Sequence, residues 1–264
     1  MDLGLAGASA VVQGGTRGMG LAAAECFAEE GASVAVLSRT RGELDDTVAR
    51  LRDLGAPRAL GLRADITDAG EVEAAFRVVE ERWGSLNILV NAAGPVGVGR
   101  FEDLADEDWQ ATLDLGAMGM IRCVRAALPL LRAAEWARIV NISAHSTKRQ
   151  SATLVSYSAA KSVVTSVTKN LSLALAGDEI LVNTVSPGSF TSPALRNWAR
   201  GVGADPDDPR AVMTAIKRHF GHGAHLPRAG TPAEIGPVIA FVASRRNSYM
   251  TGANINVDGG SDFT

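Results

Sequence analysis

The stretch SAVVQGGTRGMGLAAAECFAEEGASVAVLSR, residues 9–39, decides the fold. It holds a short apolar run (9–13), a glycine-rich turn, a helix-like stretch and a second apolar run (33–38). Strands that alternate with helices in this way predict right-handed βαβ crossovers and a parallel sheet covered on both faces. The glycines permit a tight turn after the first strand, where backbone N–H groups can approach a pyrophosphate at the helix N-terminus. The stretch therefore predicts a dinucleotide-binding unit.

The same alternation continues along the 264-residue chain. Further strand-like runs cover 59–63, 87–91, 137–143, 180–186 and 253–257. Helix-like stretches cover 18–30, 41–54, 68–83, 108–134, 156–176 and 231–243. We predict an α/β fold: a single doubly wound Rossmann-type domain over 1–264, with a seven-stranded parallel sheet and helices on both faces. The segment 193–226 breaks the rhythm and is interpreted as a substrate-loop excursion, because ligands bind beyond the strand ends of such folds.

Composition excludes several classes of protein. The net charge of -3 gives no electrostatic argument for binding nucleic acid or an anionic membrane. No apolar run approaches the ~20 residues that a transmembrane helix needs, and two cysteines suit a reducing cytosol. We expect a cytoplasmic protein. His219, His222 and His225 are spaced at threes, but glycines interrupt the helix and no carboxylate completes a ligand set, so no metal site is expected.

The end of the second strand carries the cofactor preference. No carboxylate is found about 20 residues past the glycines, where a free ribose 2′-hydroxyl usually meets one. Ser38 and Arg39 stand there instead, with Arg17 in the glycine loop, and a guanidinium matches a phosphate by bidentate hydrogen bonding. This favours NADP(H) over NAD(H); the alternative is that Arg39 and Arg41 are ordinary solvated arginines. The predicted cradle comprises Gly14, Thr16, Arg17, Gly18, Met19, Gly20, Ser38 and Arg39.

Several motifs occur in order over about 250 residues. They are GGTRGMG, Asp65 in RADITD, Asn91-Ala92-Ala93-Gly94, Tyr157-x-x-x-Lys161, Asn183 followed by Pro187-Gly188, and the terminal TGANINVDGG. With them the chain resembles the classical short-chain dehydrogenase/reductase family, and within it the 3-oxoacyl-ACP reductases and ketoreductases.

The resemblance adds further cofactor contacts. They are Asp65 and Ile66 at the adenine, Asn91, Ala92, Ala93 and Gly94 in the cofactor cleft, Tyr157, Lys161, and Pro187, Gly188, Phe190 and Ser192 near the nicotinamide. Phe190, together with Trp198 and Met213, is expected to give the substrate pocket apolar walls.

The resemblance also assigns roles to a pair of residues in the helix-like stretch 156–176. Tyr157 and Lys161 lie four apart, so a helix projects both from one face. Tyr157 is the expected general acid/base, whose pKa the Lys161 ammonium and an oxidised nicotinamide would lower. Lys161 is also expected to hold the nicotinamide ribose.

Two expected helpers of this pair are missing. Ala144 stands where the family has a serine that polarises the substrate oxygen, and Gly116 stands where it has an asparagine that holds a relay water. Ser146 is our first candidate for the lost donor, followed by His145 and Ser143. At Gly116 we expect space that a water could enter. A milder departure is Gln13, where a threonine commonly opens the glycine motif.

The leading hypothesis is NADPH-dependent reduction of a small-molecule ketone, or the reverse oxidation of an alcohol, by hydride transfer with Tyr157, Lys161 and Ser146 as catalytic residues. The alternative is a catalytically impaired NADP-binding sensor or structural subunit, because Ala144 and Gly116 replace the usual side chains. A lyase or isomerase on the same cradle is a third hypothesis. The resemblance also implies a homotetramer or homodimer that pairs through the stretches 108–134 and 156–176.

Overall fold

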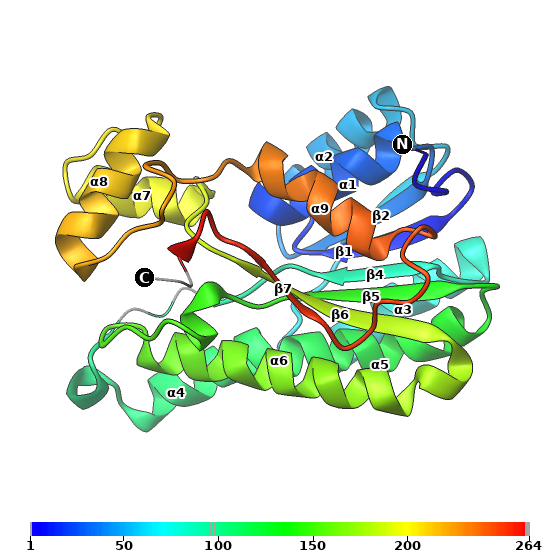
Figure 1. Cartoon of the computed structure of the whole chain (residues 1–264). Coiled ribbons are helices and arrows are strands. Elements are labelled where there is room, and N and C mark those ends of the chain that lie inside the picture. The colour runs from blue at the N-terminus through cyan, green and yellow to red at the C-terminus, as the bar shows by residue number, and fades with distance from the viewer. Residues whose placement is uncertain (1, 96, 98, 262–264) are drawn as a thin grey trace.

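A seven-stranded sheet forms the centre of the computed structural model, which describes residues 2–95, 97 and 99–261 (Figure 1). All neighbouring strands pair in parallel, in the order β3-β2-β1-β4-β5-β6-β7. The strands are β1 (Ser9–Gln13), β2 (Ser33–Ser38), β3 (Ala59–Arg63), β4 (Ile88–Asn91), β5 (Ala137–Ile142), β6 (Ile180–Pro187) and β7 (Asn254–Val257). The seven predicted strands are confirmed to within one residue at each end. The order reverses between β1 and β4, which places a ligand crevice at their carboxyl ends.

Helices cover both faces of the sheet, as predicted (Figure 1). The helices are α1 (Gly18–Glu29), α2 (Arg41–Asp53), α3 (Ala69–Trp83), α4 (Asp106–Leu113), α5 (Gly119–Arg132), α6 (Val155–Ala174), α7 (Pro193–Gly201), α8 (Pro209–Phe220) and α9 (Pro232–Ala243). Short 3₁₀ turns are η1 (Phe101–Asp103), η3 (His145–Thr147) and η4 (Ala176–Asp178). One apolar core packs α1, α2 and α9 on the sheet, and a second packs α3, α5 and α6 on the opposite face.

The long helix predicted over 108–134 is interrupted. A π-helical turn, η2 (Asp114–Met118), separates α4 from α5. Such turns are rare and mark functional sites more often than chance. The backbone lies close to its neighbours here: a Cβ on Gly116, within η2, would lie 2.8 Å from the Pro95 ring, and one on Gly119, at the start of α5, would lie 2.5 Å from the Ile66 side chain. The interruption therefore brings η2 against the loops at the carboxyl ends of the strands.

The segment 193–226 contains a helix that the pattern analysis missed. Ser192 caps α7 by accepting a hydrogen bond from the Leu195 N–H at 3.4 Å, and Pro193 occupies its first turn. A second helix of this segment is α8, which Asp208 caps by accepting a hydrogen bond from the Arg210 N–H. Both helices lie beyond the carboxyl end of the sheet, beside the C-terminal part of the described chain (Figure 1).

A row of polar side chains crosses the middle of the sheet near its carboxyl edge. Gln13, Asn91, Asn141 and Thr184 are register partners on β1, β4, β5 and β6. The Asn91 amide donates to Asn141 at 2.8 Å, and the Asn141 amide donates to Thr168 of α6 at 2.9 Å. Because these groups are buried, their hydrogen bonds fix α6 against the strand ends.

No helix in the described part of the chain has the length and apolar character needed to cross a bilayer.

Candidate active site

The pair on α6 is assembled at the carboxyl ends of β4 and β5. The Lys161 side chain is buried, and its Nζ donates to the Ile142 carbonyl at the end of β5 at 2.8 Å. A Cβ placed on Gly94 would lie 2.8 Å from the same nitrogen, so only a glycine leaves room for the amine there. The structure therefore brings together Lys161 and the loop 91–94, two parts of the predicted site.

The side chain of Ser143, directly after β5, holds α6 in position. The Ser143 hydroxyl donates to the Lys161 carbonyl at 2.9 Å and lies 2.8 Å from the Thr165 hydroxyl. Ser143 is thus engaged with the backbone of the helix that carries Tyr157 and Lys161. Its hydroxyl is therefore already engaged within the protein.

Burial controls the protonation of the pair. Burial around the hydroxyl raises the pKa of Tyr157 to about 12, although part of the ring reaches the surface. Burial lowers the pKa of Lys161 to about 8. The expectation that Lys161 lowers the tyrosine pKa is therefore wrong for the protein without cofactor, because desolvation dominates at both groups. The phenol is held in its protonated form, which is the form a general acid needs.

Of the three candidate donors near Ala144, Ser146 alone has an unengaged hydroxyl. Its Oγ is buried and has no hydrogen-bond partner among the described residues. The His145 Nδ1 lies 3.2 Å from the Pro187 carbonyl, at the end of β6. Burying a hydroxyl without a hydrogen-bond partner costs folding free energy. The Ser146 hydroxyl is therefore suited to a hydrogen bond with a bound ligand.

The space expected at Gly116 is filled. A Cβ on Gly116 would lie 2.8 Å from the Pro95 ring and 3.0 Å from the Ala160 methyl. Pro95 directly follows the motif Asn91-Ala92-Ala93-Gly94 and is buried. The expectation of a water at this place is therefore wrong, because the proline ring and the alanine of α6 occupy the volume that an asparagine side chain would need.

The glycine loop forms a cradle between β1 and α1. Gly14 adopts a φ of 76°, and a Cβ there would lie 2.6 Å from the Ala93 backbone nitrogen. The Gln13 side chain accepts a hydrogen bond from the same Ala93 N–H at 3.0 Å, which joins the loop to the end of β4. Arg17 precedes α1 and its side chain makes no capping hydrogen bond. Backbone N–H groups at this helix start are thus suited to an external anion.

The end of β2 differs from the sequence-based interpretation in one respect. Glu43, in the first turn of α2, accepts a hydrogen bond from the Thr16 hydroxyl at 3.0 Å, and Thr16 also lies 3.3 Å from Ser38. A carboxylate is therefore available at this position, contrary to expectation, because α2 folds back over the glycine loop. Arg39 lies 3.6 Å from Asp65 across the neighbouring strand end, and both are partly exposed.

Asp65 forms a turn with its own neighbours. Hydrogen bonds from the backbone and hydroxyl of Thr67, together with the Arg39 guanidinium, lower the pKa of the Asp65 carboxyl. Ile66 is buried against α5, so its side chain belongs to the core. Met19 is partly buried and also packs on the core, from the start of α1.

The segment after β6 closes the other side of the crevice. The Gly188 N–H donates to the Val257 carbonyl at 2.9 Å, and a Cβ on Gly188 would lie 2.7 Å from the Asp258 backbone. Ser192 and Pro193 face the glycine loop, since a Cβ on Gly18 would lie 3.8 Å and 3.6 Å from them. The structure thus brings the segment after β6 next to the glycine loop, two of the predicted parts of the cofactor site.

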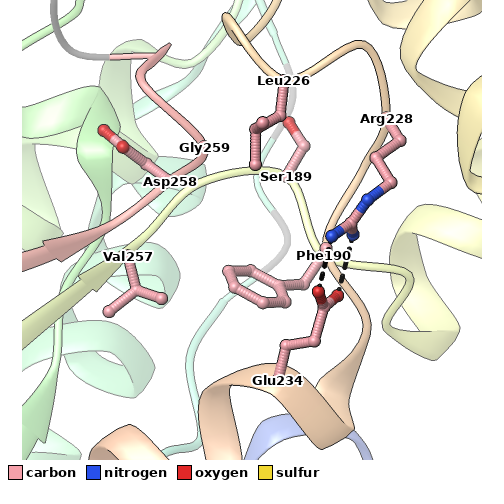
Figure 2. Close-up of a pocket in the computed structure, with 9 residues that line it drawn as sticks. Ser189, Phe190, Leu226, Arg228, Glu234, Val257, Asp258 and Gly259 are labelled. Atoms are coloured by element: carbon pink, nitrogen blue, oxygen red, sulfur yellow. Dashed lines mark hydrogen bonds and ion pairs between the residues drawn. The ribbon is translucent and has the colours of Figure 1, made fainter.

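A small cavity of about 110 Å³ lies between the ends of β6 and β7 and the segment leading into α9. Figure 2 shows Phe190, Val257 and Asp258 around it. Neither Tyr157 nor Lys161 lines this cavity, so it is separate from the catalytic pair.

The cavity is bordered by an ion pair that sequence analysis missed. Arg228 donates two hydrogen bonds to Glu234, at 2.9 Å and 2.7 Å (Figure 2). These bonds, and one from the Thr231 N–H, lower the pKa of Glu234 to about 2. The spacing of Thr231 and Glu234 signals a helix cap, but nothing in it points to Arg228.

Trp198 and Met213 have a structural use. Met213 is buried in a small core between α7 and α8, and Trp198 packs against this core with His219 and Phe220 as ring neighbours. Within the described residues, no group of three or more His, Cys, Asp or Glu side chains is placed to hold a metal ion.

Replacing Gly116 tests the packing at η2. Gly116→Asn should lower the free energy of unfolding by about 1–3 kcal/mol, because the new side chain meets the Pro95 ring. Gly177→Asn is the matched control, since no heavy atom lies within 4 Å of a Cβ there. Adding Pro95→Ala should restore part of the loss. Urea denaturation measures all four proteins, and equal losses at positions 116 and 177 would contradict the packing.

The buried amine predicts a pH dependence of stability. Between pH 8 and 10.5 the unfolded chain keeps the Lys161 proton while the native chain has lost it, so the free energy of unfolding should rise with pH. In the protein without cofactor, this adds about 1–2 kcal/mol from pH 8 to 9.5. Lys161→Met should remove the rise, and Lys217→Met, at an exposed position on α8, should keep it. A parallel pH profile for parent and Lys161→Met would refute the assignment.

Comparisons with known proteins agree with this geometry. Residues 14–262 match the family model described as "Enoyl-(Acyl carrier protein) reductase". The chain is 34% identical to the short-chain reductase protein NovJ of Streptomyces niveus, over 95% of this chain and 92% of the relative. It is also 34% identical to the monensin polyketide synthase putative ketoacyl reductase of Streptomyces virginiae, over 95% of both.

A solved structure is similar over its whole length. L-sorbose reductase from Gluconobacter frateurii, complexed with NADPH and L-sorbose, superposes with a TM-score of 0.91 at 28% identity and covers 100% of both chains. The motifs, the doubly wound sheet and these relatives agree. The chain belongs to the short-chain dehydrogenase/reductase family and is an oxidoreductase of CH–OH and C=O groups.

Proposed function

We propose that this chain reduces a small-molecule ketone to an alcohol with NADPH as hydride donor. The observation that carries the proposal is the buried Lys161 amine, which lies beside Gly94 and binds the end of β5, with Tyr157 four residues before it on α6. A phenol with a raised pKa and a glycine-lined crevice at the sheet's switch point are together suited to proton and hydride delivery.

The residues present fit a phosphorylated dinucleotide. Backbone N–H groups at the start of α1 lack a side-chain cap, and Gly14 and Gly18 adopt positive φ angles that let the backbone approach a pyrophosphate. Arg17 and Arg39 are exposed at the end where a 2′-phosphate would lie. We assign the adenine end to Asp65 and Ile66, and the nicotinamide end to the segment 187–192.

Each residue of the pair then has a defined task. When bound, NADPH supplies a hydride that forms the new C–H bond, and the ketone is reduced to an alcohol as the cofactor is oxidised to NADP⁺. Tyr157 breaks its O–H bond and gives the proton to the carbonyl oxygen. Lys161 binds the nicotinamide ribose and stabilises the phenolate that remains. A proton from solvent restores the phenol.

Ser146 is the proposed donor to the substrate oxygen in place of the missing serine at position 144. What supports this is its buried, unpartnered hydroxyl in η3, together with the engagement of Ser143 by α6. A donor placed at the developing oxyanion contributes far more in a site from which water is excluded than in solution.

The relatives favour the reductase over the alternative of an impaired sensor. Those reported above carry the names of reductases, and one was solved with NADPH and a ketose. Ketones of modest size, including oxoacyl groups, are therefore the first substrates to test.

We also propose that the chain forms one domain and assembles as a homo-oligomer. The exposed Met118 in η2 and the exposed Val163 and Leu173 on α6 support an interface through these two elements, because apolar side chains of this size gain by burial.

Catalysis is tested by NADPH consumption with a panel of ketones. Tyr157→Phe should abolish turnover, and Ser146→Ala should lower kcat by about 10²–10³. Both variants should still enhance NADPH fluorescence, which separates lost chemistry from lost binding. Ser172→Ala, which removes a buried hydroxyl near the far end of α6, should change nothing. An unchanged kcat in Ser146→Ala rules out the donor role, and turnover by Tyr157→Phe rules out the mechanism.

Cofactor preference is tested at Arg39. Arg39→Ala should lower kcat/KM for NADPH by about 10- to 100-fold and leave that for NADH nearly unchanged, because one charge-assisted contact to the 2′-phosphate is lost. Arg41→Ala, two residues on at the start of α2, is the matched control and should keep the preference. Equal effects of Arg39→Ala on both cofactors would show that Arg39 does not bind the phosphate.

A further inference from the structure

A pair of hydroxyls ties the glycine loop to the end of β2. The Thr16 Oγ1 lies 3.3 Å from the Ser38 Oγ. The Gly14 N–H donates to the Leu37 carbonyl at 2.9 Å, which fixes the same loop on the same strand. In doubly wound folds the end of this strand meets the adenosine ribose, where a free 2′-hydroxyl and a 2′-phosphate are distinguished. The two hydroxyls therefore lie at the ribose end of the proposed cofactor site.

Glu43 joins this pair from a different element. α2 lies beside α1 on one face of the sheet (Figure 1), and its first turn carries Glu43. The partly buried Glu43 carboxylate accepts a hydrogen bond from the Thr16 hydroxyl at 3.0 Å. Leu44, the next residue along α2, is buried in the core, so the turn that carries Glu43 is fixed. A carboxylate is thus held at the ribose end of the site.

The Glu43 side chain leaves the position that its own helix offers it. Thr40 and Glu43 have the spacing of a capping box, in which the glutamate accepts a hydrogen bond from the backbone N–H of the cap residue. At the start of α9 this contact is made, because Glu234 accepts from the Thr231 N–H at 2.7 Å. At the start of α2, within the described chain, the Thr40 side chain makes no capping hydrogen bond and the Glu43 carboxylate binds Thr16. Glu43 thus contacts the glycine loop in place of the start of its own helix.

The Glu43 carboxylate has no cation paired with it. None of the ion pairs that the described residues form includes Glu43, and Arg39 pairs with Asp65. A phosphate beside Thr16 would meet this negative charge. It would also compete for the single hydrogen of the Thr16 hydroxyl, which the carboxylate already accepts. A ribose 2′-hydroxyl, by contrast, can donate its own hydrogen to a carboxylate.

We propose that Glu43 weakens the preference for the phosphorylated dinucleotide, so that this chain takes NADH as well as NADPH. The inference rests on the proposed function and adds how the same site selects its hydride donor. Arg17 and Arg39 attract a 2′-phosphate, whereas Glu43 repels it and withholds the Thr16 hydroxyl. With NADH, the carboxylate accepts a hydrogen bond from the free 2′-hydroxyl. Glu43 thus acts on the choice of cofactor and not on proton transfer.

Binding is measured first, because it does not depend on turnover. Fluorescence titration gives the Kd of NADPH and of NADH. In the parent, NADPH should bind at most about 100-fold more tightly, since two arginine contacts without an opposing charge would give about 10²–10⁴. Glu43→Gln keeps the size of the side chain and removes its charge. It should lower the Kd of NADPH and raise that of NADH, and so shift their ratio by about 10- to 100-fold in favour of NADPH.

A matched variant separates this contact from a general effect of charge. Asp45→Asn removes a negative charge two residues further along α2, from an exposed side chain. It should leave the ratio within about 2-fold of the parent, because salt screens exposed charges. Should Glu43→Gln fail to fold, Glu43→Ala takes its place and must shift the ratio in the same direction.

Two fragments of the cofactor locate the effect at the ribose. Adenosine 2′,5′-bisphosphate and adenosine 5′-monophosphate both lack the nicotinamide and differ only in the 2′-phosphate. Calorimetric titration of the parent and of Glu43→Gln should show the same shift toward the phosphorylated compound. A shift that occurs with the dinucleotides and not with these fragments contradicts a contact at the 2′ position.

The outcomes separate the two proposals. A ratio of Kd values that Glu43→Gln leaves unchanged, or that Asp45→Asn shifts equally, overturns the role of Glu43. A parent that prefers NADPH by more than about 100-fold also overturns it, because the opposing charge is then without effect. If the expected shift in binding occurs but no ketone oxidises NADPH or NADH, the role of Glu43 stands and the proposed function has failed.

Discussion

Burial of a single amine organises the site. The Lys161 nitrogen is removed from water on α6, and its desolvation is compensated in part by the hydrogen bond to the Ile142 carbonyl. The position is held from two sides: Ser143 binds the backbone carbonyl of Lys161 itself, and Asn141 binds Thr168 two turns further along α6. The same amine requires a glycine at position 94, because a side chain there would displace the Lys161 nitrogen.

The two unusual residues near the pair have different physical meanings. Gly116 packs against Pro95, whose ring fills the volume that a larger residue at position 116 would take. Gly116 and Pro95 therefore form one packed unit. Ala144 is buried just after β5, and an unpartnered hydroxyl lies two residues further along the chain, at Ser146. Close packing at Gly116 removes the space for a water that could carry a proton. A hydroxyl at Ser146 can still donate a hydrogen bond to the substrate oxygen. The departures therefore do not add up to a decayed site.

Periodicity and glycine placement were enough to predict the seven strands and the crossover helices, because both depend on local sequence. Long-range contacts escaped this reasoning. Nothing in the run from Ser38 to Arg41 indicates that Glu43 folds back onto Thr16, since that contact depends on how α2 packs. The π-helical turn was missed because its 114–118 sequence is compatible with a regular helix. The raised pKa of Tyr157 in the protein without cofactor also escaped this reasoning, because burial cannot be judged from a spacing of four residues.

Burial also bears on the direction of the chemistry. Without cofactor, the phenol of Tyr157 keeps its proton up to about pH 12, while the amine of Lys161 loses its own near pH 8. At neutral pH the pair therefore holds a proton donor beside a cation, which is the state that ketone reduction requires. Alcohol oxidation needs the phenolate, and the positive charge of an oxidised nicotinamide would have to overcome the desolvation that this fold imposes. A protonated phenol beside a cation is thus the arrangement suited to giving a proton to a ketone oxygen.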